Sequence, residues 1–188
     1  MLIYKYLSDS LIDIFHSSTN PLISSTKCFK TIMFIDKRNF TKDTQSLSLE
    51  NLLNQLNEHI EKVSIIIKPY GGKIDKFLGD GILVLFDNPK FAVQAAIKLT
   101  VDIQNIGIGI DTGEVLYGSI GKPTAERLDW SVIGIPVNRA FRIEGLTNKL
   151  KCPILYTETV AHNYPSSYLG LYELKGFNLT KLYYPSES

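Results

Sequence analysis

Hydrophobic residues recur along this chain at two different spacings, and each spacing predicts a different kind of element. Between Leu49 and Ile67 they follow a helical period, which predicts a long amphipathic helix that packs on a sheet. The stripe consists of Leu49, Leu52, Leu53, Leu56, Ile60, Val63 and Ile67. The segment 31–36 is instead a short apolar run that ends in Asp36, which is typical of a strand.

Two further apolar runs, 74–78 and 82–86, are separated by a Gly-Asp-Gly turn centred on Asp80. Glycine supplies the backbone angles of tight turns, so the two runs are predicted to form a hairpin with Asp80 at its tip. Pairing this hairpin with the strand that ends at Asp36 would bring the two carboxylates together.

The remaining pattern alternates strands with helices. Helices are predicted over 91–101 and 136–146, and strands over 107–111, 153–156, 168–174 and 179–184. This alternation predicts an α/β (α+β) sandwich, in which helices flank a mainly antiparallel sheet.

The first 27 residues differ in character from the rest. Residues 1–15 have apolar side chains at helical spacing, and 16–26 are rich in Ser, Thr and Asn, as connectors are. We therefore expect an N-terminal helix and connector over 1–27, followed by one domain over 28–188. The helix is expected to cover an open edge of that domain, with a relay or dimer contact as the alternative.

Composition narrows the class of protein. With 188 residues, 44% of them hydrophobic, the chain can bury the core of one domain. Its net charge of +1 lacks the basic surplus of a nucleic-acid binder. No apolar stretch approaches the roughly 18 residues of a membrane span, and a signal peptide is not expected. Cys28 and Cys152 are too few for a disulfide framework and favour a reducing cytoplasm.

Asp36 and Asp80 form the first candidate site. Carboxylates at neighbouring strand ends suit Mg²⁺, which binds few protein oxygens and shares its other positions with substrate phosphates. Each aspartate also has a purely structural explanation, turn geometry for Asp80 and a cap for Asp36. Evidence from a further segment is therefore needed to favour a metal-binding role over a purely structural role for these two aspartates.

That segment is 129–144. Pro136 fits the first turn of a helix, which places Asn138 and Arg142 four residues apart on one face. Arginine offers a planar fork of donors that matches phosphate oxygens, and asparagine offers a donor and an acceptor to a sugar oxygen. Together they could bind a nucleotide, although both could also decorate an exposed helix face.

These motifs resemble the catalytic domain of class III nucleotidyl cyclases, the adenylate and guanylate cyclase family, from about Lys30 to Pro185. The segments that carry the resemblance are 34–41 and 71–86 (two metal-aspartate segments), 108–121 (leading into a dimer arm), 131–144 (transition-state residues) and 174–176 (a phosphate-binding lysine). The resemblance implies a ferredoxin-like fold and an enzyme, a phosphorus–oxygen lyase. Such an enzyme converts a nucleoside triphosphate into the 3′,5′-cyclic monophosphate and pyrophosphate for signal transduction.

The resemblance also implies a set of metal and phosphate ligands. Asp36 and Asp80 would hold two Mg²⁺ or Mn²⁺ ions per active site, with the main-chain carbonyl of Lys37 as a further ligand. The backbone amides around Phe40 and Thr41 would cradle the phosphates.

The other implied roles concern the ribose, the base and the terminal phosphates. Asn138 would orient the ribose, Arg142 would stabilise the transition state, and Lys175 would contact the terminal phosphates. Lys76 and Ser131 would flank the base. In this family the metal aspartates and the Asn, Arg and Lys set come from opposite subunits. We therefore expect a head-to-tail homodimer with shared active sites and an inactive monomer.

Four positions depart from the family pattern. Asn39 replaces a glycine that many relatives carry, and Gly107 stands where an arginine often helps to bind the triphosphate. Ile135 replaces an acidic or amide residue, and Phe141 replaces a small residue and adds bulk that could narrow the pocket. The missing arginine supports an alternative, a catalytically silent module that binds nucleotide for regulation. Retention of the other site residues speaks against it.

The choice of base rests on Lys76 and Ser131. Lysine can donate to a ring nitrogen of adenine, whereas guanine-selective relatives usually place glutamate there, so ATP is the favoured substrate. A pyrimidine cyclase that makes cyclic UMP or cyclic CMP in bacterial anti-phage signalling stays open. Such relatives also use compact stand-alone domains, and Trp130, Ile135 and Phe141 are irregular in this chain.

Overall fold

The computed structural model describes residues 25–38, 40, 45–121 and 129–186. The predicted helix over 1–15 lies outside the described residues, as do Asn39 and Thr41. The predicted connector over 16–26 also lies outside them, apart from its last two residues, which begin the first strand.

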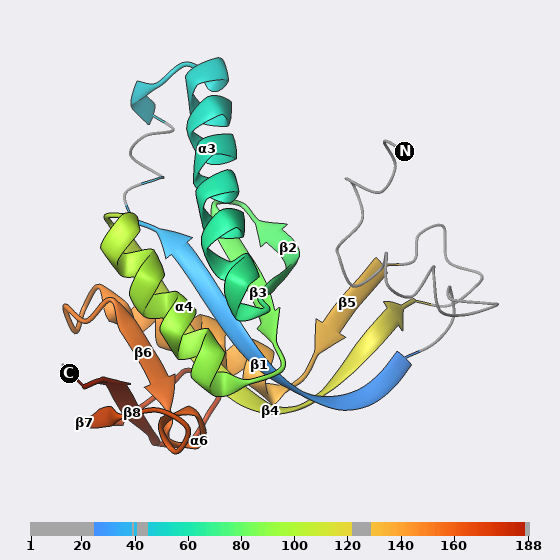
Figure 1. The fold of residues 1–188 in the computed structure, drawn as a ribbon, viewed down its shortest axis with the longest axis vertical. Coiled ribbons are helices and arrows are strands. Elements are labelled where there is room, and N and C mark those ends of the chain that lie inside the picture. The colour runs from blue at the N-terminus through green and yellow to red at the C-terminus, as the bar shows by residue number, and fades with distance from the viewer. Residues whose placement is uncertain (1–24, 39, 41–44, 122–128, 187–188) are drawn as a thin grey trace.

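An eight-stranded sheet forms the centre of the fold (Figure 1). The strands follow the order β2-β3-β1-β4-β6-β8-β7, and β5 pairs with β4. Their bounds are β1 Ser25–Lys37, β2 Lys73–Leu78, β3 Gly81–Phe86, β4 Ile106–Ile120, β5 Asp129–Ile133, β6 Ile154–Thr157, β7 Ser166–Tyr172 and β8 Thr180–Pro185. Only the β4–β6 pairing is parallel among the described strands, which confirms the predicted mainly antiparallel sheet.

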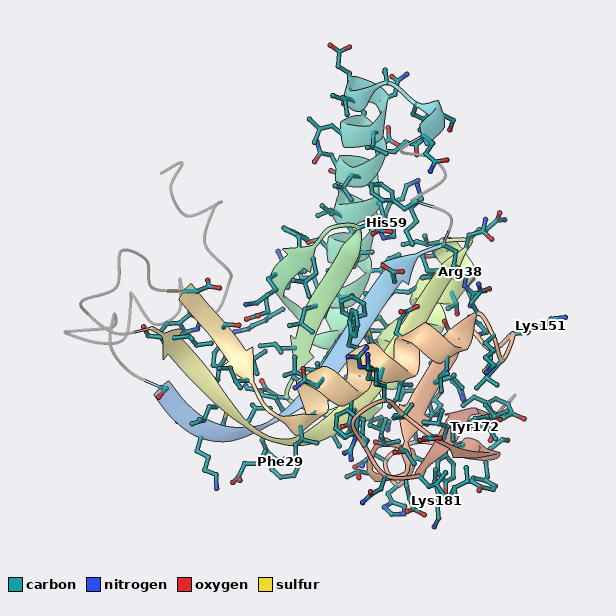
Figure 2. All side chains as sticks on the ribbon, turned by 180° about the vertical axis from the view of Figure 1, so that it is seen from behind. Phe29, Arg38, His59, Lys151, Tyr172 and Lys181 are labelled. Atoms are coloured by element: carbon teal, nitrogen blue, oxygen red, sulfur yellow. The ribbon has the colours of Figure 1, made fainter. Side chains whose placement is uncertain are left out.

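Helices cover both faces of this sheet, as predicted. Figures 1 and 2 show α3 and α4 on one face and α5 on the other. The helical segments are α3 Leu49–Ile67, η3 Lys68–Tyr70, α4 Pro89–Asp102, α5 Ile135–Thr147 and α6 Glu158–Ala161. None of these described helices combines the length and the hydrophobicity that crossing a bilayer requires.

Local signals in the sequence start these helices. The Ser48 side chain accepts a hydrogen bond from the Asn51 amide and caps α3, and Asn88 accepts one from the Lys90 amide at the start of α4. Pro136 occupies the first turn of α5, where its missing N–H would have no helical partner anyway.

The predicted apolar stripe of α3 is buried only in its second half. Val63 and Ile67 lie in the core between α3, α4 and the sheet, whereas Leu49 and Leu53 are 83% and 57% exposed. Figure 1 shows the reason, because the first half of α3 extends beyond the end of the sheet.

Helix α5 lies closer to the sheet than a side chain would normally allow. Its residues Ala140 and Ile143 are fully buried against the sheet. A Cβ atom at Gly109 of β4 would overlap the Ala140 carbonyl oxygen and the Glu144 amide, so only glycine permits this approach. The close contact fixes the helix that carries Asn138.

Candidate active site

Asp36 and Asp80 come together at one end of the sheet, as the sequence predicted. The β2–β3 turn contains Asp80, and Gly79 in that turn has a φ of +67°. Pairing of Ile35 with Ile82 across β1 and β3 places Asp36 beside this turn. Both aspartates line a cavity of about 450 Å³ together with Lys37, Arg38, Phe40, Asn105, Glu144, Gly145 and Asn148.

The two carboxylates oppose each other electrostatically. Burial, and then the charge of Asp80, raise the pKa of Asp36 to about 6. Burial also raises the pKa of Asp80, against its own backbone hydrogen bond and the charge of Lys37. Within the described residues, no group of three or more His, Cys, Asp or Glu side chains is arranged to hold a metal. Two carboxylates with open surroundings fit Mg²⁺ or Mn²⁺, which can take their other ligands from phosphates and water.

Lys37 and Phe40 line the same pocket, and the charge of Lys37 acts on Asp80. The Lys37 Nζ donates to the Gln55 Oε1 of α3 at 3.2 Å and lies 5.9 Å from the centre of the Phe40 ring. This arrangement leaves the Lys37 carbonyl, rather than its ammonium, as the group suited to a metal. Thr41, the other predicted phosphate-binding residue, lies outside the described residues.

Lys76 and Ser131 meet at a second location, between β2 and β5. The Lys76 Nζ donates a hydrogen bond to the Ser131 Oγ. It also lies 3.6 Å from the Asp129 Oδ2 and 3.8 Å from the Asp75 Oδ2. The structure therefore brings together the two residues that were predicted to flank a base.

Asn138 and Arg142 occupy the exposed face of α5 and do not line the pocket of Asp36. The Arg142 guanidinium lies 5.6 Å from the centre of the Phe141 ring, which in turn packs on Phe34 with ring centres 4.8 Å apart. Phe141 is likewise absent from the pocket lining, so its bulk lies on the sheet. Lys175 is exposed in the loop between β7 and β8.

Glu144 of α5 is a pocket residue to which the sequence assigned no role. Burial, and then the charge of Asp36, raise its pKa to about 7. A Cβ atom at Gly107 would overlap the Glu144 carboxylate and the Thr147 hydroxyl, so these side chains fill the space above Gly107. No local sequence signal indicates this contact, because it depends on how α5 packs on β4.

A buried ion pair fixes α5 over the sheet. The Arg139 Nε donates to the Asp111 Oδ2 at 2.6 Å, and its Nη2 donates to the Oδ1 at 3.1 Å. The Thr157 hydroxyl also donates to the Oδ1 at 2.7 Å. Asp111 is fully buried, and burial raises its pKa although these three donors lower it. This pair acts on the position of the helix rather than on substrate.

Several known proteins with similar sequences are named adenylate cyclases. No family model matches the chain. It is 35% identical over 153 residues to an adenylate cyclase of Anabaena cylindrica, a match that covers 71% of this chain and 30% of the relative. It is 33% identical over 146 residues to the terminal-differentiation-specific adenylate cyclase of Dictyostelium discoideum, covering 68% and 7%. The chain thus spans less than a third of the length of either relative.

Solved structures of cyclases share the fold. A bacterial light-regulated adenylyl cyclase superimposes with a TM-score of 0.84 at 24% identity, over 97% of this chain and 59% of the other. The adenylyl cyclase CyaB from P. aeruginosa does so with a TM-score of 0.73 at 27% identity, over 88% and 97%. With the sheet and the paired aspartates, these similarities show that the chain belongs to the class III nucleotidyl cyclases, which are lyases.

Proposed function

We propose that this chain converts a nucleoside triphosphate, with ATP favoured, into the 3′,5′-cyclic monophosphate and pyrophosphate. The observation that carries the proposal is the convergence of Asp36 and Asp80, from separate strands, in one open pocket. The names of the two adenylate cyclase relatives support ATP as the substrate.

Asp36 and Asp80, with the main-chain carbonyl of Lys37, would hold two Mg²⁺ or Mn²⁺ ions. Such ions, when bound, make the ribose 3′-hydroxyl more acidic and neutralise charge on the phosphates. The backbone around Phe40 and Thr41 would hold the triphosphate so that the α-phosphate faces the 3′-oxygen. A bond then forms between the 3′-oxygen and the α-phosphorus, the bond to pyrophosphate breaks, and the hydroxyl proton leaves to solvent.

The groups on α5 and the last loop would act from the other side of the substrate. Asn138 would orient the ribose through its amide, and Arg142 would stabilise negative charge as the phosphorus becomes five-coordinate. Lys175 would bind the terminal phosphates. Their exposure supports this assignment, because a substrate held between two copies could reach all three.

A homodimer with shared sites follows from the separation of these two groups. Asn138 and Arg142 do not line the pocket of Asp36, so a single copy does not present the complete set in that pocket. The β4–β5 arm also exposes apolar side chains, with Leu116 and Ile133 each 51% accessible, as an interface would. We place the enzyme in the cytoplasm, a compartment that suits the free thiols Cys28 and Cys152.

The base is assigned from Lys76 and Ser131. Their mutual hydrogen bond leaves further ammonium hydrogens on Lys76 that can donate to an adenine ring nitrogen. The test is incubation of the purified protein with Mn²⁺ and each of ATP, GTP, CTP and UTP, with products identified by mass spectrometry. We expect cyclic AMP to dominate.

Every other outcome of this substrate panel contradicts a specific part of the proposal. Dominant conversion of UTP or CTP would replace the adenine assignment with a pyrimidine cyclase. Absence of a cyclic product from every triphosphate would contradict the proposed activity and favour the silent nucleotide-binding module. Asp80→Ala, in the same panel, should lose all product while its circular dichroism spectrum stays that of the wild type.

A further inference from the structure

The guanidinium group of Arg38 lies at the pocket that contains Asp36 and Asp80. It lines the same cavity as Asp36 and Asp80, and its Nε and Nη2 are buried without a hydrogen-bond partner among the residues that the structure describes. Its amide donates to the Asn105 carbonyl at 2.8 Å, which fixes its backbone at the rim. Figure 2 shows Arg38 and Phe29 toward opposite ends of β1. Buried donors without partners cost free energy, so a residue that keeps them needs an explanation.

Among the described residues that line this cavity, Lys37 and Arg38 carry the positive charges. The Lys37 ammonium already donates to Gln55 and lies near the Phe40 ring. The Arg38 donors are therefore the positively charged group in the described pocket that is best placed for an incoming anion. A planar guanidinium binds phosphate oxygens through two parallel hydrogen bonds, which an ammonium cannot do.

The neighbouring strand cannot provide such a group. Gly107 pairs with Asp36 across β1 and β4, so a long side chain there would also reach the pocket. The Glu144 carboxylate and the Thr147 hydroxyl occupy that space, and even a Cβ atom would overlap them. Because residue 107 is glycine, a cation at this wall of the pocket comes from another position in the chain.

We propose that Arg38 binds the terminal phosphates of the substrate and supplies the guanidinium that position 107 lacks. This inference rests on the proposed function. Glu144 lies within electrostatic range of Arg38, although no ion pair joins them among the described residues. Because both donors are buried, the side chain would turn toward the cavity, where phosphate oxygens would satisfy the two donors that the described residues leave without a partner.

The test measures phosphate binding separately from turnover. Inorganic tripolyphosphate is titrated calorimetrically into the protein in buffer containing Mg²⁺, with wild type, Arg38→Ala and Arg38→Lys. Lys90→Ala, which removes an exposed charge at the start of α4, is the matched control. We expect Arg38→Ala to weaken binding about tenfold or more, Arg38→Lys to recover part of it, and Lys90→Ala to leave it unchanged.

Kinetics on the same variants give a second readout. Arg38→Ala should raise the KM for the triphosphate and the inhibition constant of pyrophosphate by the same factor, and leave inhibition by the nucleoside alone unchanged. Unchanged tripolyphosphate binding in Arg38→Ala, or none in wild type, would overturn the inference. A wild type that binds tripolyphosphate through Arg38 and yet makes no cyclic product would instead contradict the proposed function.

The double variant Arg38→Ala/Glu144→Gln separates binding from a structural role. If Arg38 only neutralises Glu144, removing both charges should restore tripolyphosphate affinity to the wild-type value, and the inference fails. If Arg38 binds phosphate, the double variant should stay as weak as Arg38→Ala. Thermal unfolding of each variant checks that the fold is retained.

Discussion

Asp75 is a buried carboxylate that lies beside Lys76. It is the extra residue where the β2–β3 register shifts, its side chain is fully buried, and neither carboxylate oxygen has a hydrogen-bond partner within the described part of the chain. Burial raises the pKa of Asp75 to about 6, Lys76 opposes that rise, and Asp129 adds to it. The charged form of Asp75 therefore destabilises the folded state. This residue lies next to the Lys76–Ser131 pair.

Replacing Asp75 by Asn should stabilise the protein at neutral pH. The pKa of this acid is higher in the folded than in the unfolded state, so the folded state binds more protons between about pH 4 and pH 6. The free energy of unfolding therefore falls as pH rises through this window. Asp75→Asn should remove that fall and add about 1–2 kcal/mol at pH 7, after the cost of burying the amide.

Urea denaturation at pH 4, 5 and 7 measures this difference. Glu61→Gln, on the exposed surface of α3, is the control and should change the free energy of unfolding equally at each pH. A wild type and an Asp75→Asn variant with the same pH dependence would contradict the buried charge at this position.

Part of the site could be predicted from residues alone. The turn around Asp80 and the strand ending at Asp36 predicted a shared location, and the structure confirms that both line one pocket. The roles of Arg38, Asp75 and Glu144 could not be predicted, because they depend on which donors and carboxylates the packing leaves without partners. Whether a buried polar group finds a partner depends on neighbouring residues that are distant in sequence.

Among the elements, the contact between β4 and α5 positions the helix that carries Asn138 and Arg142. The absent side chain of Gly109 lets the helix backbone approach the strand, and the Arg139–Asp111 ion pair fixes it there. Asn138 lies on the helix that these two features hold. The orientation of this helix is therefore set by packing on the sheet rather than by helix propensity.

Gly109→Ala should displace α5. The new methyl group would meet the Ala140 carbonyl and the Glu144 amide, both backbone atoms that cannot rotate away. We expect a loss of about 2 kcal/mol or more in the free energy of unfolding, together with lower kcat. Gly145→Ala is the matched control, since nothing lies near its Cβ and alanine favours the helix by up to about 1 kcal/mol. Equal stability of the two variants in urea denaturation would contradict this account.

Element type was predictable, and element length was less so. The predicted helix over 49–67 matches α3, and the predicted helix over 136–146 matches α5 to within one residue at each end. The predicted strand over 107–111 is instead the first third of β4, which continues to Ile120. Its second part is held by pairing with distant strands, such as Ser25 with Gly118, and such pairing leaves little trace in a local apolar pattern.

The proposed reaction requires two copies of the chain. Asp36 and Asp80 lie in a pocket that Asn138 and Arg142 of the same chain do not line. A triphosphate bound at the aspartates would therefore meet its ribose and transition-state partners on a second copy. Activity should depend on protein concentration, because dissociation of the dimer separates the two half-sites.

Mixing two inactive variants should restore activity. In a heterodimer of Asp80→Ala with Arg142→Ala, one site carries both defects and the other carries neither. Random assortment of equal amounts makes half of the dimers heterodimers with one intact site of two, so we expect about a quarter of wild-type activity. Cyclic nucleotide production is measured after co-refolding, with native mass spectrometry to verify the heterodimer. Verified heterodimers without activity would rule out shared sites.

In the proposed mechanism, Asp36 and Asp80 bind divalent ions beside a triphosphate whose other contacts come from a second copy of the chain. A crystal structure with Mn²⁺ and a non-reactive nucleoside triphosphate tests it most directly, since manganese is located by its anomalous signal. We predict manganese between the two aspartates, with Asn138 and Arg142 of a second copy at the ribose and α-phosphate. A bound nucleotide with no manganese at these aspartates would contradict the account.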